Sequence, residues 1–134
     1  MKEKRAFVLE DQNAISGAYK ETLSYYDLVV KTSIIEAFQQ IESDCKFDLF
    51  VIAAYVATRA SEERAGGELQ STEKLVKRIS FFTEGKVPII VTSDSKTFRD
   101  EVETASYIKV CGKLEIAEVL KEISGEKTAN MPKQ

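Results

Sequence analysis

Short apolar runs alternate along the chain with stretches in which apolar residues recur every three or four positions. The apolar runs predict five strands, over Arg5–Glu10, Asp27–Lys31, Asp48–Ala54, Val87–Val91 and Ser106–Val110. The helically spaced stretches predict five helices, over Gln12–Tyr26, Ser33–Asp44, Ser71–Phe82, Ser95–Ala105 and Leu114–Ser124. Strands that alternate with helices in this way are typical of a parallel sheet covered by helices on both faces.

Several positions carry signals for where these elements begin and end. Ser33, followed three residues later by Glu36, forms a capping-box signature at the start of the second helix. Gly85 and Gly125 are predicted to end the third and fifth helices. The almost wholly apolar segment Asp48–Ala54 indicates a strand that is buried on both faces.

The fold class that follows is α/β, with a five-stranded parallel sheet in the flavodoxin-like order 2-1-3-4-5. In that order, ligands bind beyond the carboxyl ends of the strands, near the switch between strands 1 and 3. We expect one domain over residues 1–125 and a flexible tail or truncated linker over residues 126–134. The connection Tyr55–Gln70 is long for this fold, and the sequence leaves its role open.

Composition excludes several classes of function. The chain of 134 residues has no histidine, which excludes Ser-His and Cys-His nucleophile pairs and histidine-ligated zinc. A net charge of −3 does not favour nucleic-acid binding by this domain. Cys45 and Cys111 form no metal-binding pattern and suggest free thiols in a reduced, cytoplasmic setting. The apolar run near the N-terminus is too short to cross a membrane.

Candidate chemistry gathers after the predicted strands. Glu10 and Asp11 end the first strand, Ser93 follows the fourth, and Lys113 follows the fifth. Two adjacent carboxylates suit Mg²⁺, while a hydroxyl and an ammonium group suit a phosphoryl oxygen. Each residue alone is more often structural, but the topology would bring all of them to one crevice.

Four segments in order resemble the receiver domains of two-component signalling, over roughly residues 4–124. They are FVLEDQNAI, FDLFVIAAY, VPIIVTSD and CGKLEIAEVLKEI. The resemblance implies that Glu10 and Asp11 bind Mg²⁺, that Ser93 follows the phosphoryl group and that Lys113 is its charge partner. It also places Ala53 where the family has its phospho-accepting aspartate, five residues after Asp48.

The chain departs from the receiver pattern in further places. The loop after the third strand is long, Leu114 replaces the usual proline, and Val110 stands where the family has an aromatic switch residue. Tyr107 lies out of register for that role. Without a carboxylate at position 53 the Mg²⁺ site loses a ligand, so we expect only weak binding and no other cofactor.

Two interpretations of Ala53 remain open: a natural pseudo-receiver, slightly favoured by these departures, or an aspartate replaced to block phosphorylation. Either way we expect a response-regulator-like signalling and interaction module in a phosphorelay, which is not an enzyme. Its partners would be a sensor kinase, a phosphotransfer protein or an output target, and a homodimer is open. The alternatives are a scaffold or dimerisation domain of a larger regulator, or a flavodoxin-like cofactor-binding protein. The latter lacks a glycine-rich phosphate loop.

Overall fold

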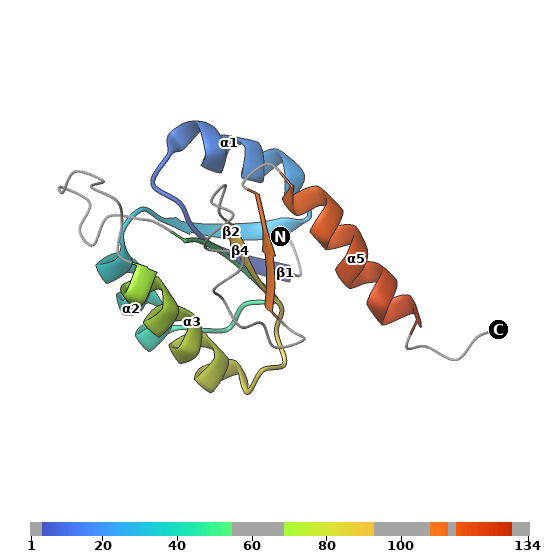
Figure 1. Cartoon of the computed structure of the whole chain (residues 1–134). Helices are drawn as coiled ribbons and strands as arrows, with labels where there is room; N and C mark the ends of the chain where they lie inside the picture. The colour runs from blue at the N-terminus through green and yellow to red at the C-terminus, as the bar shows by residue number, and fades with distance from the viewer. Residues whose placement is uncertain (1–3, 55–68, 93–107, 113–114, 130–134) are drawn as a thin grey trace.

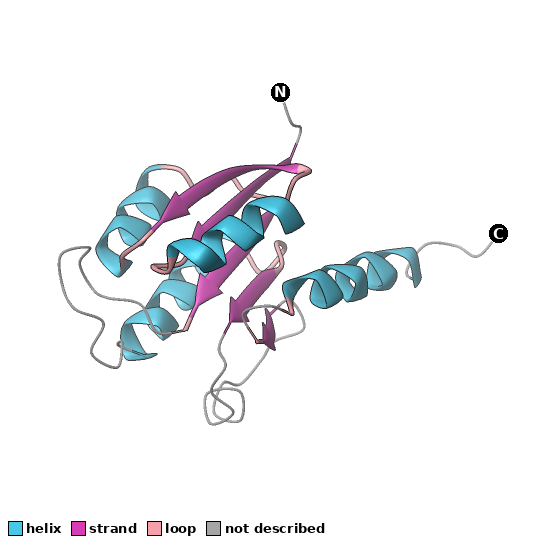
Figure 2. Cartoon of the chain, turned by 90° about the horizontal axis from the view of Figure 1, so that it is seen from above, coloured by secondary structure: helices cyan, strands magenta, loops and turns pink. Residues whose placement is uncertain are grey.

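The structure is a computed structural model that describes residues 4–54, 69–92, 108–112 and 115–129 (Figure 1). Its sheet has five strands in the order β2-β1-β3-β4-β5. They are β1 (Lys4–Leu9), β2 (Tyr26–Lys31), β3 (Leu49–Ala53), β4 (Ile89–Thr92) and β5 (Ile108–Cys111). Every neighbouring pair is parallel, and the arrows point the same way in Figure 2. The predicted fold class and strand order are confirmed.

Four helices are described, and they form two layers. The helices are α1 (Asn13–Thr22), α2 (Ile34–Ser43), α3 (Leu69–Thr83) and α5 (Ile116–Ala129). In Figure 1, α2 and α3 lie on one side of the sheet, and α1 and α5 lie on the other. None of the helices in the described residues is long and apolar enough to cross a membrane. The helix expected over Ser95–Ala105 lies outside the described residues.

Strands β3 and β4 are buried from end to end and β1 is buried from Ala6 onward, whereas the edge strands β2 and β5 are mostly half-buried. Successive side chains of each inner strand point to opposite faces. Phe50 and Ile52 therefore join the core under α2 and α3, while Leu49 and Val51 join the core under α1 and α5. This two-sided burial explains why the inner strands are continuous apolar runs.

The capping signal at α2 is confirmed in detail. The Oγ atom of Ser33 accepts a hydrogen bond from the backbone N–H of Glu36 at 3.3 Å and donates one to its carboxylate at 3.1 Å. Ser33 has the extended backbone of an N-cap residue. A local sequence signal is sufficient here because both partners lie within one helical turn.

Of three predicted helix boundaries, the one at Gly85 is confirmed and two are wrong. The first helix ends at Thr22, not Tyr26, because Tyr26 pairs with Lys4 as the first residue of β2. The third helix ends at Thr83, and Gly85 follows it at φ 68° and donates its N–H to the Ser80 carbonyl, as expected for a glycine that ends a helix. The fifth continues through Gly125 to Ala129. One glycine weakens a helix by only about 1 kcal/mol, and the neighbouring residues can outweigh it.

Candidate functional site

The carboxyl edge of the sheet brings the predicted acidic pair level with Ala53. Leu9 pairs with Ile52, so Glu10, the next residue, stands beside Ala53. Ala53 in turn pairs with Thr92, the last residue of β4. Ala53 is fully buried, and the side chain that it presents at this edge is a methyl group.

Glu10 is held in place by its own loop. Its side chain is only 1% exposed, and its backbone N–H donates to the Lys31 carbonyl at 3.1 Å. Its Oε2 atom accepts a hydrogen bond from the backbone N–H of Gln12 at 3.0 Å. In a phosphate-binding loop, backbone N–H groups such as that of Gln12 are free to donate hydrogen bonds to the ligand. Here the Glu10 carboxylate already accepts the hydrogen bond from this N–H, which argues against a flavodoxin-type site.

Among the described residues, this edge offers only part of the oxygen ligands that a magnesium ion prefers. Asp11 is half-buried next to Glu10, but position 53 contributes no oxygen ligand. Within the described parts of the chain, no three acidic or thiol side chains are grouped so that they could hold a metal ion. Mg²⁺ prefers octahedral oxygen coordination, and two neighbouring carboxylates supply only part of it.

Two predicted site residues, Ser93 and Lys113, lie outside the described residues, as do Tyr107 and Leu114. Val110 is the β5 partner of Val91 and is half-buried. The Tyr55–Gln70 connection is described only from Leu69, which is already part of α3.

Two threonines at this edge were not singled out from the sequence. The Thr72 hydroxyl at the start of α3 donates to the Ala54 carbonyl at 2.7 Å, which ties α3 to the end of β3. The Thr92 hydroxyl is buried beside Ala53 and has no hydrogen-bond partner in the described structure. The sequence feature that could have pointed to Thr92 is its place as a polar residue at the end of an apolar strand.

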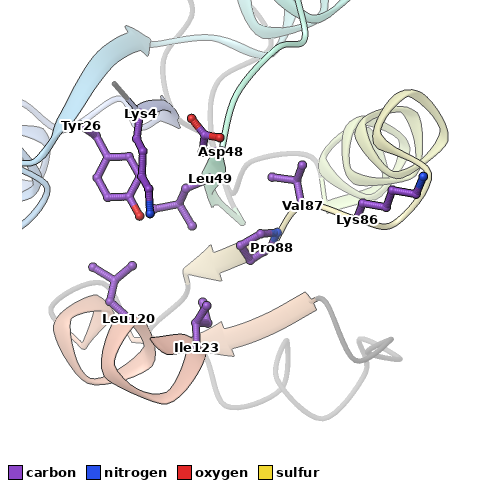
Figure 3. Close-up of a pocket in the computed structure, with 9 residues that line it drawn as sticks. All are labelled: Lys4, Tyr26, Asp48, Leu49, Lys86, Val87, Pro88, Leu120 and Ile123. Carbon is purple, nitrogen blue, oxygen red and sulfur yellow. The ribbon is translucent and has the colours of Figure 1, made fainter. Parts of the chain in front are cut away.

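A pocket of about 320 Å³ opens at the opposite edge of the sheet, at the starts of the strands (Figure 3). Lys4, Tyr26 and Asp48 line it together with Leu120 and Ile123 of α5. Burial and the Asp48 carboxylate raise the pKa of Tyr26, so its hydroxyl stays protonated at neutral pH. This pocket is separate from the edge that carries Glu10 and Ala53.

Comparison with solved structures identifies the fold. The receiver domain of an HD domain-containing protein from Pseudomonas fluorescens Pf-5 has a TM-score of 0.64 at 14% identity, covering 96% of this chain and all of that one. The chain has the receiver fold. A CheY-like receiver domain from Methylobacillus flagellatus matches with a TM-score of 0.61 at 15% identity. The match covers 90% of this chain and 98% of that domain.

The PhyR response-regulator receiver domain from Erythrobacter litoralis has the same fold, with a TM-score of 0.62 at 15% identity. The match covers 100% of this chain and 98% of that domain. No family model matches the sequence. No curated protein matches it either. The receiver fold is therefore retained here at a level of sequence identity that leaves function to be argued from the site itself.

Proposed function

We propose that the chain is a receiver-like signalling module that acts by binding proteins and does not accept a phosphoryl group. The observation that carries the proposal is the register at the carboxyl edge, where the buried methyl group of Ala53 stands between Glu10 and Thr92. In a receiver, an aspartate at this position attacks phosphorus with a carboxylate oxygen. A methyl group has no lone pair with which to do so.

The acidic pair supports a receiver-like origin of the site. Glu10 is buried and its orientation is fixed by the Gln12 amide, an arrangement that keeps a carboxylate next to position 53. Burying a carboxylate is costly, and a core that needed only packing would favour an apolar residue. We infer that Mg²⁺ binds weakly here and that Ser93 and Lys113 complete the surroundings of the site.

Without phosphorylation, such a module signals through a conformation that its partners select. A partner shifts the population of states by as much as its affinities for those states differ. The partners that fit this role are a sensor kinase, a phosphotransfer protein or an output target. The module is not an enzyme in this proposal, because the receiver chemistry lacks its nucleophile.

The test is to restore the carboxylate in Ala53→Asp and to supply acetyl phosphate with Mg²⁺. The aspartate oxygen should form a bond to phosphorus while acetate leaves, and intact mass should increase by one phosphoryl group. Ala53→Asn is the matched control, since it has the same shape without the nucleophilic carboxylate. Both this control and the unchanged chain should gain no mass.

Two results would contradict the proposal. A phosphoryl group on the unchanged chain would mean that another residue accepts it. An Ala53→Asp protein that is folded by NMR but neither shifts with Mg²⁺ nor reacts would mean that the edge is not a receiver site.

A further inference from the structure

Two adjacent phenylalanines near the end of α3 lie on the surface of the molecule. Phe81 is 71% exposed and Phe82 is 40% exposed. Their rings contact each other edge to face, with centroids 5.7 Å apart. Single exposed apolar side chains are common, but a contiguous aromatic pair on one helix marks a surface for interaction.

Arg78 contacts both rings of this pair. Its guanidinium lies 5.7 Å from the ring centroid of Phe81 and 4.7 Å from that of Phe82. Its Nε and Nη2 atoms donate to the two carboxylate oxygens of Glu42 on α2, at 2.6 and 3.2 Å. This bidentate pair positions the guanidinium against both rings before any partner binds, which lowers the ordering cost of binding.

Two lysines extend the same face toward the start of α3. Residues three and four apart share one side of a helix, and this side includes Lys74, Lys77, Arg78, Phe81 and Phe82, with the exposed Glu73 at its edge, four residues before Lys77. The neighbouring side, next to Phe82, contributes Leu75 and Ile79 to the core. Among the described residues, neither Lys74 nor Lys77 has an ion-pair partner. Two cations without ion-pair partners thus lie within about two helical turns of Phe81, in a chain whose net charge is −3.

We propose that this face of α3, defined by those five residues, docks a partner protein through an acidic amphipathic helix. Apolar side chains of such a helix would cover the two rings, and its flanking carboxylates would pair with Lys74 and Lys77. An anionic membrane is a poorer fit, because electrostatic lipid binding uses clusters of four or more basic residues. Here Glu42 neutralises Arg78, which leaves only two unpaired cations on the face.

This docking surface does not depend on the proposed receiver-like function. It is made of exposed residues of α3, which lies with α2 on one side of the sheet (Figure 1), and it does not include Glu10 or Ala53. The phosphorylation experiment on Ala53→Asp and the binding experiment below can therefore fail independently.

The test uses a fluorescent synthetic helical peptide of about 18 residues, five turns, with a leucine stripe flanked by glutamates. Titration with the whole chain should give saturable anisotropy that weakens as salt is added. Phe81→Ala/Phe82→Ala should weaken binding about tenfold or more, as expected for central aromatic contacts. Tyr25→Ala is the matched control, since it removes an aromatic ring that is 85% exposed elsewhere, and it should bind normally.

A second pair of variants tests the charges. Lys74→Glu/Lys77→Glu should weaken binding about tenfold and reduce its dependence on salt. Lys20→Glu/Lys121→Glu makes the same change in net charge at exposed positions on other helices and should leave binding unchanged. Thermal melts of all four variants establish that each one is folded.

Several results would overturn the proposal. One is equally tight binding of a peptide with lysines in place of its glutamates, and another is binding that survives the double phenylalanine change. Sedimentation could instead show that the unchanged chain self-associates and that Phe81→Ala/Phe82→Ala does not. That result would identify the occupant as a second copy of the chain. Binding to vesicles containing phosphatidylserine, with none to the acidic peptide, would identify a membrane instead.

Discussion

The two helix layers cover the same sheet with different kinds of core. Under α2 and α3, the rings of Phe7, Phe47 and Phe50 pack against one another with centroids 5.5 to 6.1 Å apart. Under α1 and α5 the core is largely aliphatic apart from Tyr19, and the pocket lined by Leu49, Leu120 and Ile123 opens beside it. The first layer is closed by interlocking rings, whereas the second leaves space next to its core.

The N-terminal caps of α1 and α2 also differ, and again the α2/α3 layer has the stronger interaction. At α2, Ser33 caps the first turn with its side chain. At α1, the N-cap residue is Gln12, whose side chain makes no capping hydrogen bond. The comparison suggests that the α2/α3 layer supplies more of the fold's rigidity. It also suggests that substitutions in the α1/α5 layer can increase the stability of the protein.

The largest expected effect comes from a matched pair of core truncations on β3. Ile52 lies under α2 and α3 and Leu49 under α1 and α5, and both are almost fully buried. Ile52→Ala should lower the free energy of unfolding by about 4 kcal/mol, and Leu49→Ala by about 2–3 kcal/mol, because space beside the pocket can be filled by water or by shifting side chains. Urea denaturation of both variants measures the difference. Equal losses would mean that the two layers are packed alike.

The next effect is the loss of the cap at α2. Ser33→Ala removes the acceptor for the Glu36 N–H and should destabilise the fold by about 1 kcal/mol. Ser33→Asp serves as a control, because aspartate is also a good N-cap and should preserve most of the stability. Thermal unfolding of both variants tests this, and an unchanged midpoint for Ser33→Ala would show that the cap contributes little.

A smaller effect of opposite sign is expected at α1. Gln12→Ser would place a hydroxyl at an N-cap position that already has extended backbone, with φ −100° and ψ 115°. The gain in unfolding free energy should be about 0.5–1 kcal/mol. Gln12→Ala offers no acceptor and is the control. If serine and alanine behave alike in urea, α1 gains nothing from a cap.

The last prediction concerns the rate of a thiol reaction. Cys45 packs against the α2/α3 core, and burial, together with Asp44 and Glu42, raises the pKa of its thiol to about 11. Its thiolate fraction at pH 8 should be roughly 100-fold below that of an unperturbed thiol, so alkylation should be slow and should accelerate with pH up to about 11. Because the unfolded thiol ionises first, this group's contribution to stability is full below pH 9 and declines between pH 9 and 11.

The measurement is iodoacetamide labelling of Cys111→Ser, followed by intact mass, so that only Cys45 reacts. The same variant in urea gives the rate for an exposed thiol. Equal rates in the folded and unfolded protein at pH 8 would contradict the shielding of Cys45.

Much of this fold was predictable from sequence because its signals are local. The apolar run at β3, the Ser33 cap and the helical spacing in α2 each involve residues within one or two turns or one strand. The order of the strands also followed, because right-handed crossovers leave few ways to connect five parallel strands of this length. The receiver resemblance placed Ala53 at the carboxyl edge beside Glu10, where the strand register puts it.

Other features depended on contacts between distant residues. Helix α1 ends early because β2 pairs with β1 from Tyr26 onward, and α5 continues past Gly125, although a glycine is a common stop signal. The pairing of Ala53 with Thr92 and the bond from Thr72 to Ala54 join segments about 20 to 40 positions apart.

The sequence by itself therefore determined the class of fold and the strand order, and it places an alanine, not a carboxylate, at position 53. The tertiary structure alone decided that Phe81 and Phe82 face water while Arg78 bridges them to Glu42. Periodicity places a residue on one side of a helix, but which side meets the core, and which charge lies next to it, depends on how α2 and α3 pack side by side on one face of the sheet.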